Sequence, residues 1–342
     1  MLERFTSLPV QDRREALAVA AGRLQRPVYL LEKDVWVVWT IQTLFQAPFA
    51  EHLAFKGGTS LSKAYGIIRR FSEDVDLTYD IRALAPNLAG HSNEPIPPTR
   101  SQQKKWTDEI RGRLPAWIAN TVTPAVEQRL RAETLVARVA QDADRLTIEY
   151  EAVTTHSAYL RPAVLLEFGA RSTGEPTEPR GIACDASAAL PELEFPTANP
   201  RVMRAERTFW EKATAMHVYC AQGRFRGGER FSRHWHDISR MHDAGVVRRA
   251  ITDRELAHRV ARHKSAFFPE RDFAGGWIDY NRSVNGQLRL VPTGDALASL
   301  ASDYRQMMAD GLLLDDAESF DELMTRCGSI EQLANASLGG TS

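Results

Sequence analysis

Apolar and polar residues alternate along this chain with two different periods. Apolar residues recur every three to four positions over residues 29–45 and 59–70, which predicts helices. Residues 74–82, 145–150 and 163–168 are short runs rich in Val, Ile, Leu, Thr and Tyr, which predict strands. We expect these strands to belong to one sheet, because helices and strands are interleaved in this part of the chain.

From residue 201 onward the pattern is helical. Helical spacing is clearest over residues 205–220, 234–243, 253–264 and 295–308. Residues 83–105 are rich in Pro, Asn, Ser and Gly and lack a period, which predicts a long surface loop. The sequence therefore predicts an α/β (α+β) fold, with a mixed sheet flanked by helices in residues 1–200 and a C-terminal helical domain in residues 201–342.

Composition and charge narrow the class of protein. The chain has 342 residues, of which 43% are hydrophobic, so it can bury the cores of two domains. Apolar runs long enough to span a bilayer are absent and the N-terminus lacks a signal-peptide pattern, so we expect a soluble cytoplasmic protein without membrane contact. The net charge of −1 means that any contact with nucleic acid must come from a local basic patch.

The run Lys56-Gly57-Gly58-Thr59-Ser60 stands directly before the helical pattern of residues 59–70. A Gly-Gly turn that opens a helix presents unpaired backbone N–H groups and the positive end of the helix dipole. Both features bind phosphate groups. We therefore expect this run to bind the phosphates of a nucleotide, although a Gly-Gly turn by itself is a weak signal.

Asp74 and Asp76 are separated by one residue in a predicted strand, so both side chains point to the same face. Carboxylates in this arrangement can hold Mg²⁺, and two such ions about 3.5–4 Å apart neutralise a triphosphate during phosphoryl or nucleotidyl transfer. Glu167 is the only acid in the apolar run 163–168. It is the candidate third metal ligand, able to help deprotonate an attacking hydroxyl, unless it is a solvent-facing residue of an edge strand.

A basic segment interleaved with aromatic residues connects two predicted helices. Phe225 and Phe231 alternate there with four arginines, Arg224, Arg226, Arg230 and Arg233. Arginine and aromatic side chains together bind the phosphates and stack on the bases of single-stranded RNA. The alternative is a solvated connection between helices, and the pattern does not decide between the two.

Two other kinds of site are disfavoured by spacing. The histidines His234 and His236 are two residues apart instead of four, and Cys184, Cys220 and Cys327 are isolated from each other, which disfavours zinc. The Gly-x-Ser-x-Gly turn of a serine hydrolase is absent from the sequence.

Four stretches together resemble a known family. They begin at Lys56 (KGGTSLSKAY), Phe71 (FSEDVDL), Arg207 (RTFWEK) and Ser232 (SRHWHDI). This set resembles the AbiEii/AbiGii toxin family, also called MenT-like toxins, which belongs to the polymerase-β-like nucleotidyltransferase superfamily. The resemblance implies a nucleotidyltransferase-fold sheet. It also implies a catalytic core formed by the Gly-Gly turn and the Asp-x-Asp strand, a lysine that contacts the nucleotide phosphates, and a later aspartate that completes the site.

Matched by position, these residues are Gly58, Thr59, Asp74, Asp76, Lys212 and Asp237. The segment Arg233-His234-Trp235-His236-Asp237 keeps only the second of the two acids found in the commoner family pattern, so the role of His234 is open. Ser72 occupies the Ser-x-Asp position that is phosphorylated in some relatives, which makes it a candidate regulatory site.

The resemblance also implies a function. Members of the family use a nucleoside triphosphate to modify tRNA acceptor ends, which blocks translation, and a cognate antitoxin opposes them. By resemblance this chain is a Mg²⁺-dependent nucleotidyltransferase toxin of a toxin–antitoxin or phage-defence (abortive-infection) system, acting on RNA, with the tRNA 3′ end as the expected acceptor. Two alternatives stay open: an enzyme that transfers a nucleotidyl or phosphoryl group to a protein, and an inactive interaction module.

Overall fold

The computed structural model describes residues 2–68, 70, 72, 74–154, 161–223, 231–309, 313 and 318–338. The chain forms two compact units. The sheet unit contains Met1–Ala64, Ser72–Pro95 and Thr107–Met203. The helical unit contains Tyr65–Phe71, Ile96–Trp106 and Arg204–Ser342. Two segments that precede residue 107 thus belong with the residues after 203.

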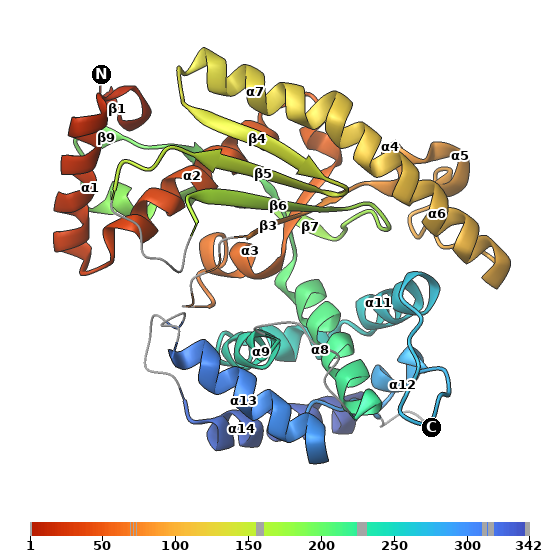
Figure 1. Cartoon of the computed structure of the whole chain (residues 1–342). Helices are drawn as coiled ribbons and strands as arrows, with labels where there is room; N and C mark the ends of the chain where they lie inside the picture. The colour runs from red at the N-terminus through yellow and green to blue at the C-terminus, as the bar shows by residue number, and fades with distance from the viewer. Residues whose placement is uncertain are drawn as a thin grey trace. The chain divides into compact units, whose positions relative to one another are not determined.

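A seven-stranded mixed sheet is the centre of the sheet unit (Figure 1), which confirms the expected α/β class. The order of its strands is β4-β5-β6-β3-β2-β11-β7. The bounds are β2 (Leu53–Lys56), β3 (Asp74–Tyr79), β4 (Ala137–Asp142), β5 (Arg145–Tyr150), β6 (Ala163–Gly169), β7 (Thr177–Pro179) and β11 (Arg201–Met203). Strand β3 is parallel to β6 and antiparallel to β2, so sequence-distant motifs lie side by side at the middle of the sheet.

One face of this sheet is buried. Alternate residues of β3, β5 and β6 form it, namely Val75, Leu77, Leu146, Ile148, Val164, Leu166 and Phe168. Helices α2 (Val28–Phe45) and α7 (Thr123–Ala132) contact the sheet and each other. Helix α3 (Gly57–Lys63) contacts β2 and β3, and Figure 1 shows it across the sheet from α7. The side chains of β3 that do not join the core are therefore left for a site beside α3.

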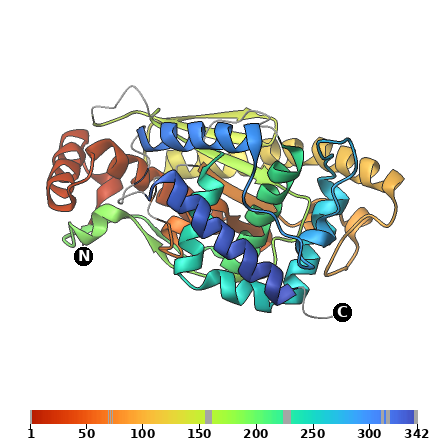
Figure 2. The ribbon, with the colours of Figure 1, turned by 90° about the horizontal axis from the view of Figure 1, so that it is seen from below.

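A second core lies at the N-terminal end of the sheet unit. Helix α1 (Val10–Leu24) packs on α2, and the ring of Phe5 stacks on Phe195 with centroids 4.7 Å apart. The short strands are β1 (Glu3–Arg4) with β9 (Leu193–Glu194), and β8 (Ile182–Ala183) with β10 (Thr197–Ala198). The pair β1 and β9 lies near the N-terminus in both views (Figures 1 and 2).

The helical unit is built around α8. Helix α8 contacts α9, α10, α11 and α12, and both Phe209 and Trp210 on it are fully buried. The bounds are α8 (Ala205–Gln222), α9 (Arg233–Asp243), α10 (Val246–Thr252), α11 (Arg254–Phe267), α12 (Tyr280–Ser283), α13 (Gly294–Ala309) and α14 (Phe320–Leu338). Within the described part of the chain, none of the helices combines the length and the apolarity that a bilayer span needs.

Three predicted elements differ from the structure. The helix expected over residues 59–70 is α3 and already ends at Lys63; Gly66, at φ 63°, follows in a left-handed conformation. The strand expected over residues 74–82 ends at Tyr79, because Asp80 caps α4 (Ile81–Leu84) by accepting from the Arg82 N–H. The loop expected over residues 83–105 instead contains α5 (Pro86–Ala89) and the start of α6 (Arg100–Trp117).

Candidate active site

The turn between β2 and α3 lies directly against the Asp-x-Asp strand. Gly57 has φ 78°, a conformation that favours glycine, and a Cβ atom added to it would be 1.9 Å from the Oδ2 atom of Asp76. The carboxylate of Asp76 therefore occupies the space that any other residue at position 57 would fill. The sequence motif of two glycines and two aspartates is thus one compact structural unit in which backbone and carboxylate are in contact.

A row of charged residues crosses the same face of the sheet. Lys56 on β2 is opposite Asp76 on β3, Asp76 is opposite Glu167 on β6, and Glu167 is opposite Arg145 on β5. Residues directly opposite in neighbouring strands point to the same face. Asp74 lies two residues along β3 on this face as well, so the three predicted metal ligands share one side of the sheet.

Hydroxyl groups hold α3 against β3. The Thr59 hydroxyl donates to the carbonyl oxygen of Asp74 at 2.5 Å and is hydrogen-bonded to Ser72 Oγ at 2.9 Å. The Ser60 hydroxyl donates to the carbonyl oxygen of Gly57 at 2.9 Å. Thr59 and Ser60 are fully buried, so their side chains position the turn. The N-cap of α3 is Lys56, which makes no side-chain capping bond to the first-turn N–H groups that were predicted to bind phosphate.

A partly buried ionic network anchors the other end of α3. The Lys63 ammonium is 2.6 Å from Asp34 Oδ1 and 2.8 Å from Asp185 Oδ1. Arg26 also contacts Asp185. Burial would lower the pKa of Lys63, but the charges of the two aspartates outweigh it and raise that pKa. The helix that carries the Gly-Gly turn is therefore fixed at both ends.

The carboxylates of the sheet unit fit a divalent cation. Asp76 and Glu167 are like charges directly opposite each other, an arrangement that a bound cation would stabilise. Mg²⁺ prefers carboxylate oxygens and is usually bound by one or two carboxylates together with substrate phosphates. Glu167 also makes an ion pair with Arg145 at 2.8 Å. Among the described residues, no group of three His, Cys, Asp or Glu side chains is arranged to hold a metal by itself.

The helical unit contains a separate buried cluster of charges around Asp237. Its carboxylate is fully buried and accepts two hydrogen bonds from Arg70, at 2.7 Å to Oδ1 and 2.9 Å to Oδ2. The Lys212 ammonium lies 2.9 Å from Oδ2 of the same carboxylate. His234 Nδ1 is 3.4 Å from that ammonium. The structure thus brings together the two predicted residues of this unit, Lys212 and Asp237.

Burial and charge act in opposite directions on this cluster. Burial alone would raise the pKa of Asp237, but Arg70 and Lys212 hold it well below its usual range. Burial lowers the pKa of Lys212, against the attraction of Asp237. Burial, and then the charge of Lys212, lowers the pKa of His234 well below its usual value, so this imidazole is neutral and able to accept from the ammonium. Two cations, Arg70 and Lys212, thus share the carboxylate of Asp237.

Arg70 is the residue of this cluster that sequence reasoning missed. It lies 167 positions from Asp237 in the sequence, and neither periodicity nor spacing connects the two. The predicted phosphate contact of Lys212 stays a prediction, as does the phosphorylation of Ser72. Of the four arginines proposed to contact RNA, Arg233 begins α9, whereas Arg224, Arg226 and Arg230 lie outside the described residues.

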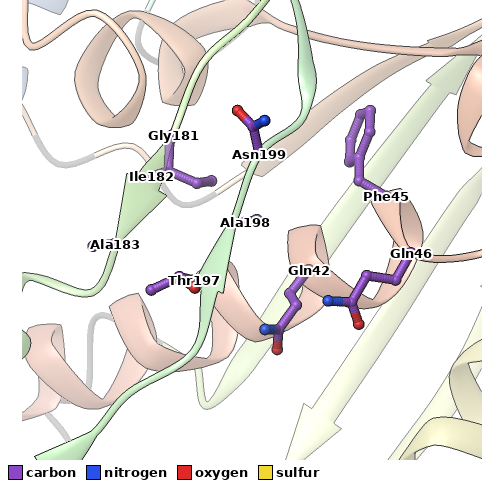
Figure 3. Close-up of a pocket in the computed structure, with 9 residues that line it drawn as sticks. All are labelled: Gln42, Phe45, Gln46, Gly181, Ile182, Ala183, Thr197, Ala198 and Asn199. Carbon is purple, nitrogen blue, oxygen red and sulfur yellow. The ribbon is translucent and has the colours of Figure 1, made fainter.

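A surface groove of about 610 Å³ lies elsewhere in the sheet unit, between the end of α2 and the strands β8 and β10 (Figure 3). Gln42, Phe45, Gln46, Gly181, Ile182, Ala183, Thr197, Ala198 and Asn199 line it. Its lining contains no charged side chain and none of the predicted site residues. Because a triphosphate needs positive groups or a metal beside it, this groove does not fit the predicted substrate.

A glycine turn packed on an Asp-x-Asp strand of a mixed sheet is the arrangement expected of a nucleotidyltransferase. Residues 40–326 match the family described as nucleotidyl transferase AbiEii toxin, type IV toxin–antitoxin system. The chain therefore belongs to the AbiEii nucleotidyltransferase toxin family, which confirms the family resemblance of the four motifs.

A solved structure is also similar to this chain. It is MenT4, a nucleotidyltransferase toxin from Mycobacterium tuberculosis, at 15% identity and a TM-score of 0.46. The match covers 95% of this chain and 90% of that chain. A search of curated proteins finds no match.

Proposed function

We propose that this protein is a Mg²⁺-dependent nucleotidyltransferase toxin that transfers nucleotides from a nucleoside triphosphate to RNA, at the 3′ acceptor end of tRNA, and so blocks translation. The observation that carries the proposal is the contact between Gly57 and the carboxylate of Asp76. Because of this contact, backbone N–H groups that can bind phosphate lie beside carboxylates that can bind a metal. A nucleotide triphosphate with its cation needs both kinds of group.

The roles of the residues in the sheet unit follow from this arrangement. The first turn of α3, from Gly57 to Ser60, binds the triphosphate through its backbone N–H groups, and Lys56 adds a positive charge beside it. Asp74 and Asp76 hold Mg²⁺, and Glu167 is the third candidate ligand. Bound Mg²⁺ supplies charge neutralisation on the triphosphate.

The proposed reaction is a displacement at the α-phosphorus. The 3′ hydroxyl oxygen of the RNA forms a bond to this phosphorus, the bond to the β-phosphate oxygen breaks, and pyrophosphate leaves with the electron pair. A carboxylate of the site accepts the hydroxyl proton, and Glu167 is the candidate for this role. Each turnover thus adds one nucleotide and releases one pyrophosphate.

The charged cluster of the helical unit has a role in the same proposal. Lys212 is the candidate phosphate contact and Asp237 the residue that orients it, because their charged groups are 2.9 Å apart. A buried lysine held by a carboxylate keeps its ammonium in one position, whereas a surface lysine samples many. A cognate antitoxin completes the proposed system.

Label transfer tests the proposal. The purified protein is incubated with total tRNA, Mg²⁺ and each α-labelled nucleoside triphosphate in turn, beside the variants Asp74→Ala and Asp76→Ala. Asp142→Ala, which removes an exposed carboxylate at the end of β4, is the matched control. We expect label on tRNA with the unchanged protein and with Asp142→Ala, and none with the other two variants. A repeat with EDTA tests the dependence on Mg²⁺.

Three other results would overturn parts of the proposal. Label on a protein band instead of tRNA would move the acceptor to protein and keep the nucleotidyltransferase activity. Label on tRNA that survives Asp74→Ala and Asp76→Ala would show that this strand does not hold the metal. Absence of label from both RNA and protein, with any of the four nucleotides, would favour an inactive interaction module.

A further inference from the structure

Exposed aromatic side chains are concentrated in one short segment of the helical unit. Among the described residues, the aromatic side chains that are large and exposed are Phe268 (38%), Phe273 (80%) and Trp277 (48%). All three lie between α11 and α12, within ten residues of one another (Figure 1). Exposure of so much aromatic surface is costly in water and marks interaction sites when it is clustered.

This segment is an ordered hairpin. Arg271 and Trp277 form an antiparallel bridge, Asp272 N–H donates to the Gly276 carbonyl at 2.9 Å, and Ile278 N–H donates to the Glu270 carbonyl at 3.0 Å. Phe273 stands at the tip of the hairpin. Its backbone N–H donates to the carbonyl oxygen of Ala221, at the end of α8, at 3.0 Å. The exposed ring is therefore presented on a fixed backbone.

Cations accompany each of the other two rings. The guanidinium groups of Arg100 and Arg271 lie 4.3 Å and 4.1 Å from the centroid of the Trp277 ring. The Lys264 ammonium lies 5.0 Å from the centroid of Phe268. Cations at these distances are attracted to the faces of the rings. Aromatic surface and positive charge thus occur together at the same exposed place.

The acids near the hairpin are engaged in local hydrogen bonds. Asp272 Oδ1 accepts from Gly276 N–H at 2.8 Å, and Asp279 Oδ1 accepts from Asn281 N–H at 3.0 Å. Glu270 Oε2 accepts from the Gln222 amide at 3.2 Å. These three carboxylates stabilise the loop and its contact with α8, whereas the cations lie on the exposed rings. Arg100 begins α6, and Lys104, four residues further along that helix, adds an exposed positive charge on the same side.

From these observations we propose that the hairpin of Glu270–Ile278, with Arg100 and Lys264, binds the single-stranded end of the RNA acceptor. Exposed aromatic rings stack on bases of any sequence, and arginine and lysine contact the phosphates between them. Phe273 is the stacking residue at the tip, and Arg271 and Arg100 contact phosphates beside Trp277. A duplex has its bases already stacked, so this site selects single strands. The inference rests on the proposed function for the identity of the ligand as RNA.

Binding without a nucleotide tests this site separately from catalysis. The full-length protein is titrated into a fluorescein-labelled single-stranded RNA of twelve nucleotides that ends in CCA, and anisotropy gives the Kd. We expect Phe273→Ala to weaken binding roughly tenfold and Phe273→Tyr to bind as the unchanged protein does, because the ring is retained. Met308→Ala, which shortens an exposed side chain of the same unit, is the control with unchanged Kd.

Salt dependence tests the charges. The slope of log Kd against log salt should decrease by roughly 0.7 for Arg271→Gln and again for Arg100→Gln, since each removes one phosphate contact with a single strand. Unlabelled duplex RNA should compete much less well than the single strand. Circular dichroism of each variant confirms that the fold is retained.

Four results would overturn the inference. The first three are absence of RNA binding by the unchanged protein, an unchanged Kd for Phe273→Ala, and equal competition by duplex RNA. The fourth is a change from dimer to monomer in Phe273→Ala, because the hairpin would then be a contact between two copies of the chain. If no label is transferred to tRNA but the protein binds the RNA and this binding depends on the Phe273 ring, the proposed function is refuted and the RNA site at the hairpin stands. If label transfer to tRNA requires Asp74 but Phe273→Ala binds the RNA with an unchanged Kd, the proposed RNA site at the hairpin is refuted and the proposed function stands.

Discussion

Replacement of Gly57 by alanine is the most direct test of the contact at the centre of the sheet unit. The backbone at this position has φ 78°, where a Cβ atom is strained regardless of its surroundings. The added Cβ would also lie 1.9 Å from Asp76 Oδ2 and 2.6 Å from its Cγ. Gly57→Ala therefore introduces two separate penalties, one from the backbone and one from the carboxylate.

The two penalties have known sizes. A left-handed conformation costs an alanine about 1–2 kcal/mol. Ordinary contact begins at 3.4 Å, so the carboxylate oxygen, at 1.9 Å, has to move by 3.4 − 1.9 = 1.5 Å. Overpacking of this kind costs about 1–3 kcal/mol. We expect the free energy of unfolding to fall by roughly 2–5 kcal/mol in total, and nucleotidyl transfer to fall about a hundredfold, because a proposed metal ligand is displaced by more than 1 Å.

Urea denaturation of matched variants separates these penalties. Gly294 has φ 58° and open space around it, so Gly294→Ala carries the backbone penalty alone and should cost only about 1–2 kcal/mol. In an Asp76→Ala background the two closest clashing atoms are gone. In this background the cost of adding Gly57→Ala should approach the cost of Gly294→Ala. The difference between the costs of Gly57→Ala in the unchanged and the Asp76→Ala backgrounds is the coupling energy of Gly57 and Asp76. Equal costs of Gly57→Ala and Gly294→Ala in the unchanged background would refute the proposed contact.

Three further results are expected. Asp237→Asn removes the buried carboxylate charge that Arg70 and Lys212 share, and urea denaturation should show a loss of about 3–5 kcal/mol; a loss below 1 kcal/mol would contradict the ion cluster. Burial lowers the pKa of His217 from 6.5 to about 4, so between pH 6.5 and about pH 4 the unfolded chain binds a proton that the folded chain does not. Unfolding free energies measured at pH 7 and pH 5 should differ by about 2 kcal/mol from this group, with more stability at pH 7, and His217→Gln should lose that difference. Lys63→Met removes the cation shared by the buried Asp34 and the half-buried Asp185 and should cost about 3 kcal/mol by thermal denaturation, and an unchanged Tm would refute this role.

The sheet was largely predictable because its strands carry a simple period. Alternation over β3 and β6 indicated which residues face the core and placed Asp74 and Asp76 on one side. The strands β8, β9 and β10 have two residues each, too few for any alternation to appear, so no sequence pattern predicts them. Helix α14 was not predicted either, because many of its positions are small or polar and its apolar period is therefore weak.

The site was predictable only in part. The Gly-Gly turn and the two aspartates follow from general phosphate and metal chemistry, whereas Lys212 and Asp237 were assigned through resemblance to a family. That Gly57 is in contact with Asp76 depends on three-dimensional packing between β2, α3 and β3. The partner of Asp237 is Arg70, 167 residues away, and no local pattern distinguishes a buried arginine from the solvated majority.

The division of the chain into units has a consequence for its synthesis. The chain passes from one unit to the other after residues 64, 71, 95, 106 and 203. Arg70 leaves the ribosome 167 residues before Asp237, an interval of about 8–33 s at roughly 5–20 residues per second. During this interval the helical unit lacks the carboxylate that its arginine binds. A message broken between the codons of Arg70 and Asp237 therefore releases a fragment whose helical unit lacks the carboxylate that Arg70 binds.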